Sequence, residues 1–257
     1  MIERSFHTPE SLRLDLEIPA GSVEIETVDG DETSVMLDSN DERALAAARV
    51  ELRPRAGGQD LVVATERQAL LGGLVKISIG SLGVGSSDYR LHVRCPHGAE
   101  LRVRTAAADV RALGRFARGD VQTASGDVDL GEIEGDLVLK TVSGDAVVRR
   151  VGGKVVANLV SGDLDVADAA RSAQAKTVSG DVHLVVRDGE VGIVSVSGDI
   201  EVGVRSGSRL HVDANSLSGD LDSEVPLADA PAGGSGDGPL VDLRAKTVSG
   251  DFRVVRA

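Results

Sequence analysis

The tripeptide Ser-Gly-Asp recurs at a fixed interval, and this repeat constrains the fold more than any other feature of the chain. Its aspartate falls at Asp127, Asp145, Asp163, Asp181 and Asp199, a period of 18 residues held four times in succession. One further step back reaches Asp109, in the degenerate sequence Ala107-Ala108-Asp109. The motif returns at Asp220 and Asp251, and the heptapeptide at 175–181 is repeated identically at 245–251. We therefore interpret the chain as a repeat protein.

Each 18-residue unit has the pattern of two turns and two short strands. Glycine recurs at nine-residue intervals through this region, as expected of turns. An apolar-polar-apolar triplet follows each aspartate, and such alternation is typical of a strand with one face in a core. We expect these side chains to point inward: Val128, Leu130, Val148, Leu164, Val182 and Leu184. We expect Asp129, Asp165 and His183 to point outward.

Two short strands per unit, without helical spacing, predict an all-β fold. The expected architecture is a single-stranded parallel β-solenoid, or β-helix, with 18-residue coils. One coil cannot bury its apolar face alone, so the coils above and below complete the core. Coils about 4.8 Å apart would build a rod of roughly 40 Å from about eight coils. Right-handed winding is expected from the general preference of parallel crossovers.

The chain divides into a regular and a less regular part. Residues 101–257 are predicted to form the regular solenoid, with a Pro- and Gly-rich loop insertion at 226–239 and 240–256 as its terminal strands. Residues 1–100 are predicted to form an irregular β section that caps the first coil and protects its open edge. We expect strands at Leu12–Ile18, Val23–Glu26, Leu61–Val63, Leu74–Ile79 and Tyr89–Arg94, a turn at Pro19–Gly21, and a short helix within Arg43–Val50.

Composition limits the classes of partner. Acidic residues outnumber basic ones 41 to 28, giving a formal net charge of −13, which disfavours nucleic acid and anionic membrane surfaces. The N-terminus lacks the apolar stretch of a signal peptide, and no run approaches the roughly 18 apolar residues of a spanning helix. The lone Cys95 cannot form an internal disulfide. These features predict a cytoplasmic protein. With both ends of the rod shielded, we expect a monomer or small homo-oligomer.

Several segments resemble a known family. The Ser-Gly-Asp ladder is accompanied by the entry segment at 18–25, the middle segment Val93-Arg94-Cys95-Pro96-His97-Gly98-Ala99-Glu100-Leu101, and the closing segment Lys246-Thr247-Val248-Ser249-Gly250-Asp251-Phe252. Together they resemble the bacterial β-strand-repeat proteins called putative adhesins, over nearly the whole chain. The resemblance implies a β-solenoid fold. It implies no activity, because the function of that family is unknown.

The aspartate column is the sharpest chemical feature. Stacked coils would place Asp109, Asp127, Asp145, Asp163, Asp181 and Asp199 on one edge of the rod. We expect these side chains to accept backbone N–H bonds within their own coil, as turn residues do. The alternative is a row of Ca²⁺ ions, a cation that prefers carboxylate oxygens. The calcium-binding G-G-x-G-x-D pattern is missing, so we predict no metal site and no cofactor.

Other motifs lack the context that their chemistry needs. The tripeptide Arg118-Gly119-Asp120 matches an adhesion motif, but Gly-Asp pairs are so common here that chance explains it. Strand alternation puts His92 and Cys95 on opposite faces, so they should not share a metal with His97. The glycines at 72–73 and 80–85 lack the lysine of a phosphate-binding loop. The five histidines are scattered, and we predict no catalytic residue.

Three classes of function compete. The preferred class is a non-enzymatic binding or scaffold module that presents a repetitive surface to a protein or surface ligand of unknown identity. The second is a self-assembling solenoid resembling the bactofilin cytoskeletal proteins. The third is a carbohydrate-active β-helix enzyme resembling pectate lyases. An aromatic content of only 2% disfavours the third class, because sugar rings are usually held on aromatic platforms.

Overall fold

The computed structural model describes residues 1–65, 87–225 and 239–257. The described elements up to residue 122 are β1 (Ile2–His7), β2 (Leu12–Val28), β3 (Glu32–Ser39), α1 (Glu42–Ala47), β4 (Arg49–Arg55), β5 (Gly58–Ala64), β6 (Tyr89–Pro96) and β7 (Ala99–Gln122). The next are β8 (Val128–Ile133), β9 (Leu137–Ser143), β10 (Ala146–Val151), β11 (Val155–Ser161), β12 (Leu164–Ala169), β13 (Ala173–Lys176), β14 (Val182–Val186), β15 (Gly189–Val194) and β16 (Ile200–Val204). The last are β17 (Arg209–Ser218), β18 (Leu221–Ser223), β19 (Leu240–Ser249) and β20 (Phe252–Arg256).

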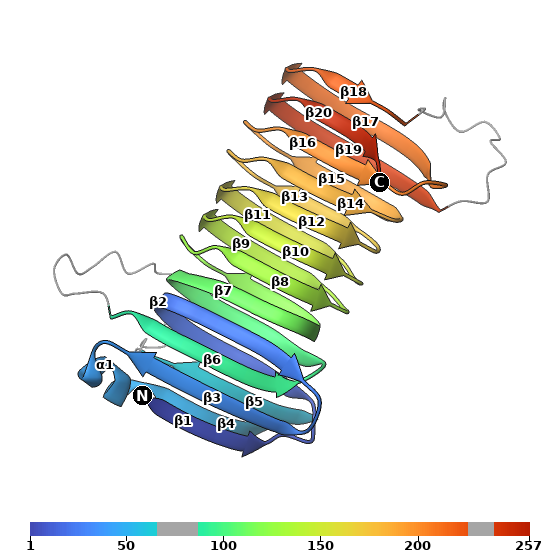
Figure 1. Cartoon of the computed structure of the whole chain (residues 1–257). Helices are drawn as coiled ribbons and strands as arrows, with labels where there is room; N and C mark the ends of the chain where they lie inside the picture. The colour runs from blue at the N-terminus through green and yellow to red at the C-terminus, as the bar shows by residue number, and fades with distance from the viewer. Residues whose placement is uncertain (66–86, 226–238) are drawn as a thin grey trace.

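Consecutive coils stack in parallel to form a rod (Figure 1). We call the surface formed by β8, β10, β12, β14, β16, β20 and β18 the first face, and that formed by β9, β11, β13, β15, β19 and β17 the second face. The register follows the sequence period, since Val128 pairs with Ala146 and Ala146 pairs with Leu164. The predicted all-β parallel solenoid with 18-residue coils is confirmed.

The core is made from the inward residues of both faces. The predicted inward side chains are all buried: Val128, Leu130, Val148, Leu164, Val182 and Leu184. Their alternate neighbours Asp129, Asp165 and His183 point outward and are partly exposed. The strand register inferred from the alternation is therefore right. Small aliphatic side chains suit this core because the two faces and the coils above and below must all interdigitate in a thin layer.

The coil order at the C-terminal end differs from the chain order. The last segment of the chain, β19–β20, pairs with β15–β16 on one side and with β17–β18 on the other. The expectation that 240–256 forms the terminal strands of the rod is therefore wrong. The outermost coil is the earlier segment 209–223 (Figure 1). Coils with near-identical turn sequences offer equivalent stacking partners, so chain order alone does not determine which coil lies outermost.

The N-terminal section joins the rod through β2. This strand pairs in parallel with β7 along most of its length, and β5 and β6 pair in parallel with its other edge. The strands β1, β3 and β4 then add in antiparallel orientation. The parallel ladder therefore includes part of the first hundred residues. Two strands at this end, β1 and β4, each pair with one neighbour within the described residues.

The local expectations for this section can be compared with the structure. The expected turn at Pro19–Gly21 is a corner inside the continuous strand β2, where Gly21 has a φ of 112°. The expected helix is α1, and the Asp41 carboxylate accepts N–H bonds from Arg43 and Ala44 at its start. The strand expected at Leu74–Ile79, the glycines at 72–73 and 80–85, and nearly all of the loop at 226–239 lie outside the described residues. No described helix has the length and apolar character to cross a membrane.

Candidate functional site

The Ser-Gly-Asp turns stack directly on one another along one corner of the rod. Their glycines from residue 144 onward adopt φ values between 132° and 156°, which side-chain-bearing residues rarely adopt. Each also lies against the backbone of the preceding turn, so that a Cβ at Gly180 would be 2.2 Å from the carbonyl oxygen of Gly162. Glycine is required here both for its backbone conformation and for the close stacking of the coils.

The aspartates of these turns link the coils to each other. The backbone N–H of Asp181 donates to Asp163 Oδ1 at 2.8 Å, and that of Asp199 donates to Asp181 Oδ1 at 2.8 Å. The same bond joins all neighbouring aspartates in the spatial order 109, 127, 145, 163, 181, 199, 251 and 220. Our expectation of bonds within one coil is therefore wrong. Each carboxylate up to that of Asp251 accepts the N–H of the next coil, because the stacked turns bring that group within reach.

This ladder explains how carboxylates of the same charge can lie one coil apart. Every carboxylate except that of Asp220, the last rung, accepts a hydrogen bond from a backbone N–H of the described residues, and every rung remains exposed to water, which screens the repulsion. Among the described residues, no group of three or more His, Cys, Asp or Glu side chains has an arrangement that could hold a metal ion. That Asp127, Asp145, Asp163, Asp181 and Asp199 bind no calcium stays a prediction, which thermal unfolding with calcium can test.

An exposed apolar column runs beside the aspartates. We call it the valine ridge and define it as Val142, Val160, Val178, Val196 and Val248. These side chains are 43–48% exposed, and each precedes an exposed serine of the motif. Backbone bridges join Ser161 to Ser179, Ser179 to Ser197 and Ser197 to Ser249, so four of these coils lie in register. The ridge was not predicted from the sequence, although the valine that recurs in Val-Ser-Gly-Asp was its signal.

An acidic groove lies next to the corner at the C-terminal end of the rod. It encloses about 700 Å³ on the first face, and acidic side chains predominate in its lining. Its carboxylates are Asp181, Asp199, Glu201, Asp220, Asp222 and Asp251. Two basic side chains share the groove: His183 lies 3.6 Å from Glu201, and Arg253 lies 3.8 Å from Asp222. The groove therefore favours a cationic ligand over an anionic one.

The opposite corner of the first face holds a cluster of arginines. The Arg187 guanidinium forms a two-bond ion pair with Asp168, a side chain only 13% exposed. Arg150 and Arg205 approach the same carboxylate at 3.9 and 3.7 Å. The hydrogen bond from Arg187 lowers the pKa of the Asp168 carboxyl, and the positive charges of the arginines add to this effect. These four residues lie far apart in the sequence, and only the stacking of the coils brings them together.

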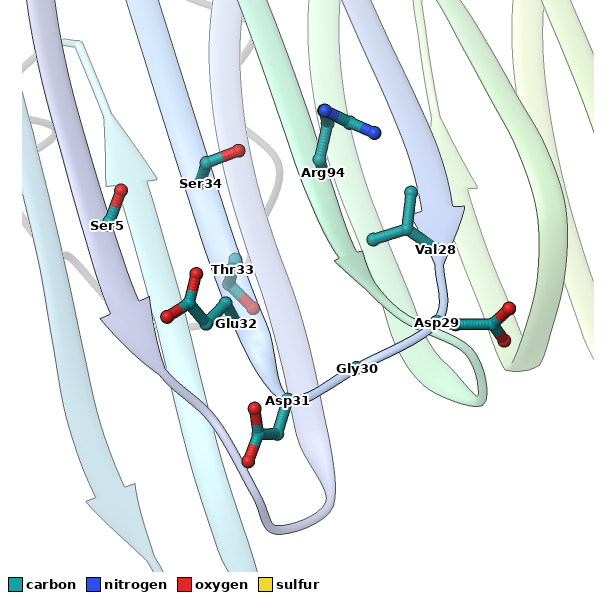
Figure 2. Close-up of a pocket in the computed structure, with 9 residues that line it drawn as sticks. All are labelled: Ser5, Val28, Asp29, Gly30, Asp31, Glu32, Thr33, Ser34 and Arg94. Carbon is teal, nitrogen blue, oxygen red and sulfur yellow. The ribbon is translucent and has the colours of Figure 1, made fainter.

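A second pocket lies at the N-terminal end, around the turn between β2 and β3. It measures about 390 Å³ and is lined by Asp29 and Asp31 of the turn, by Glu32 and Ser34 of β3 and by Arg94 of β6 (Figure 2). The carboxylates at this turn also contact histidines, since His7 lies 3.6 Å from Asp31 and His97 lies 3.4 Å from Asp29. These are exposed pairs of the kind that stabilise a fold very little.

The remaining sequence candidates do not assemble into a site. Arg118-Gly119-Asp120 lies inside β7, where Gly119 and Asp120 pair with β9, so the motif is part of a strand and not a loop tip. Cys95 is fully buried, and this burial raises the pKa of its thiol to about 12. His92 alternates to the other face of β6, while His97 Nδ1 lies 2.6 Å from Thr27 Oγ1. The predicted separation of His92 from Cys95 is confirmed.

Comparison with solved structures finds one that shares the fold and two weaker matches. A putative adhesin from Bacteroides fragilis NCTC 9343 matches with a TM-score of 0.51 and 12% identity, covering 99% of this chain and 96% of that chain. A putative cell adhesion protein from Clostridium sporogenes ATCC 15579 has a TM-score of 0.32 and 6% identity, covering 100% and 99%. A putative lipid binding protein from Parabacteroides distasonis ATCC 8503 has a TM-score of 0.29 and 13% identity, covering 99% and 96%. Only the first score is high enough to support a shared fold.

Sequence comparison supplies the family. No curated protein matches this chain. The model of the family described as Toastrack DUF4097 matches twice, over residues 76–191 and over residues 154–255. The two matches overlap across the coils of the middle of the rod, as expected when one repeat can be aligned to another. Together they span more than half of the chain, and this protein therefore belongs to the Toastrack DUF4097 family.

Proposed function

We propose that this protein is a non-enzymatic binding or scaffold module and that the valine ridge is its contact surface for a protein partner. The observation that carries the proposal is the ridge itself, five half-exposed valines on consecutive coils. At a strand spacing of about 4.8 Å they extend over roughly 19 Å. Scattered exposed apolar side chains are normal, but a continuous row of them is typical of an interaction surface.

The surroundings of the ridge support a polypeptide as the partner. Exposed serines and the aspartate column lie on one side, so an apolar strip is bordered by hydrogen-bonding groups. This combination of an apolar centre and a polar border is common in protein interfaces. The carboxylates favour a partner with basic residues near the contact. The binding role also agrees with the name of the solved structure that shares the fold, which is called a putative adhesin.

The experiment compares two double variants that remove the same chemistry at different places. Val160→Thr/Val178→Thr changes the ridge, and Val147→Thr/Val194→Thr changes valines of equal exposure elsewhere. Threonine keeps the β-branched shape that strands favour, so both variants should fold. Affinity capture with cross-linking from the native cell should recover the same partner with wild type and the control, and at least tenfold less with the ridge variant. Equal recovery with all three would refute the ridge as the contact surface.

A further inference from the structure

Among the described residues, the outermost coil, 209–223, has a neighbouring coil on only one side. Its Leu221 pairs with Phe252, and Phe252 pairs with Ile200, so the three side chains stand in one core column. Ile200 and Phe252 are 1% and 3% exposed, whereas Leu221 is 52% exposed. Leu217 continues the valine ridge and reaches 85% exposure. Leu221, whose equivalents are core residues in the inner coils, therefore forms an exposed apolar end of the rod together with Leu217.

The backbone at this end is also unpaired. Within the described residues, β17 pairs only with β19 and β18 only with β20, so each has a free outer edge. The aspartate ladder ends in the same place. Asp220 donates its N–H to Asp251, but its own carboxylate accepts no hydrogen bond from the part of the chain that the structure describes. Free strand edges and an open acceptor favour the addition of another strand.

The other end of the rod offers matching strands. The edge strand β4 belongs to the second face. It pairs with β5, β5 pairs with the first half of β2, and that half pairs with β7 up to Thr105. Thr105 donates a hydrogen bond to Thr123 of the next coil, which lies on the second face. The edge strand β1 belongs to the first face, through β3, β6 and β2. Stacking one copy on another end to end would thus place β17 against β4 and β18 against β1.

Charge distinguishes between the possible orientations. Residues 209–224 carry Asp213, Asp220, Asp222 and Glu224 against the single Arg209, a formal charge of −3. The strand β4 carries Arg49, Arg53 and Arg55 against Glu51, a formal charge of +2. Two acidic C-terminal ends would repel each other, whereas an acidic and a basic end attract.

We propose that the outermost coil binds the N-terminal end of a second copy of this chain, so that rods associate head to tail. The occupant is this protein itself, with β18 and β17 meeting β1 and β4 of the next copy. The contact would cover Leu221, pair the free edges and satisfy the Asp220 carboxylate. It revises the expectation of shielded ends, and it is independent of the valine ridge.

Sedimentation of the purified full chain between about 5 and 500 µM tests this proposal. The average mass should rise with concentration, and the rise should shrink at high salt because the two ends attract through their charges. Leu221→Lys should weaken the association at least tenfold. Val147→Lys introduces the same charge at an equally exposed valine in the middle of the rod and should change it less than twofold. The Val160→Thr/Val178→Thr variant should associate like wild type.

The orientation is tested by blocking each end separately. Arg49→Glu/Arg53→Glu makes the N-terminal end acidic, and Lys140→Glu/Arg149→Glu is its control with the same change in net charge on exposed mid-rod residues. Leu221→Lys and Arg49→Glu/Arg53→Glu should each be monomeric alone. Mixed together they should form one-to-one dimers, since each retains one intact and complementary end. Circular dichroism and thermal unfolding should show that both fold.

Three results would overturn the proposal. The first is a wild type that stays monomeric over the whole concentration range. The second is association that the control substitutions weaken as much as the end substitutions do. The third is an Arg49→Glu/Arg53→Glu variant that still dimerises alone, because that would indicate contact between two C-terminal ends.

Discussion

The inner coils and the outermost coil carry the same motif and differ in how much of it is buried. Leu164 and Leu221 stand at the same position after a Gly-Asp turn, yet Leu164 is 1% exposed and Leu221 is 52% exposed. The turn, the strand and the residue type are the same in both. Burial in a solenoid therefore comes from the coils on either side and not from the repeat itself. Matched substitutions in the two regions test whether the neighbouring coils supply this burial.

The largest expected effect is on the core leucines. Leu164→Ala should lower the free energy of unfolding by about 2–5 kcal/mol, because it removes buried methyl groups and leaves a cavity. Leu221→Ala should cost about 0.5 kcal/mol, as for a surface position. Urea unfolding followed by circular dichroism measures both at a protein concentration where the chain is monomeric. Similar losses would show that the outer coil is covered in solution.

The next effect concerns the turn glycines. Gly180→Ala should cost about 2–3 kcal/mol, since its φ of 142° disfavours a side chain and the new Cβ would meet the Gly162 carbonyl oxygen. Gly207→Ala, in the turn that leads to the outer coil, has a φ of 90° but no atom within 4 Å of the added Cβ. It should cost about 1 kcal/mol, from the backbone strain alone. Thermal unfolding of the two variants gives the difference, which disappears if coil stacking tolerates a Cβ.

Ion pairs should likewise contribute more to stability between inner coils than at the outermost coil. Asp168→Asn should cost about 1–3 kcal/mol at pH 7, because it leaves three arginines without their shared carboxylate. Asp222→Asn, in an exposed pair with Arg253 at 3.8 Å, should have no measurable effect.

The pH dependence of stability provides a second test of the Asp168 ion pairs. The folded-state pKa of Asp168 is lowered, so its stabilising contribution is complete above the usual aspartate pKa of 3.8 and is lost as the pH falls through the lower folded value. The stability difference between wild type and Asp168→Asn should therefore shrink as the pH falls from 4 towards roughly 2. A difference that stays constant over this range would show that the ionised carboxylate contributes nothing.

The smallest effects are expected along the aspartate ladder. Asp163→Ala leaves the Asp181 N–H without its acceptor and should cost about 1 kcal/mol, whereas Asp220→Ala breaks no such bond and should be near neutral. Asp163→Asn keeps an acceptor oxygen and should also be near neutral. At equal ionic strength, calcium should raise the melting temperature of wild type no more than magnesium does. A saturable calcium-specific rise, reduced in Asp163→Asn, would instead support a cation-binding column.

The fold could be predicted from local patterns. Period-two alternation assigns Leu184 inward and His183 outward without any knowledge of the neighbours, because a strand has only two faces. The 18-residue interval sets the register in the same way, since Ser-Gly-Asp turns can stack only when they coincide. The candidate contact surface was harder to predict from the sequence. The valine ridge repeats with the motif, but its significance depends on knowing that the second position before the glycine faces water.

The repeat, the coil length and the two faces follow from the amino-acid sequence, because these features depend on residues close together in the chain. The order in which the coils stack is visible only in the folded molecule. The identical segments 175–181 and 245–251 are equivalent partners for a growing stack, so the sequence does not show that 240–256 lies between 189–204 and 209–223. That order exposes Leu221 and leaves Asp220 as the last rung. Stacking likewise brings Arg150, Arg187 and Arg205 to Asp168, since residues on separate coils meet only when the coils do.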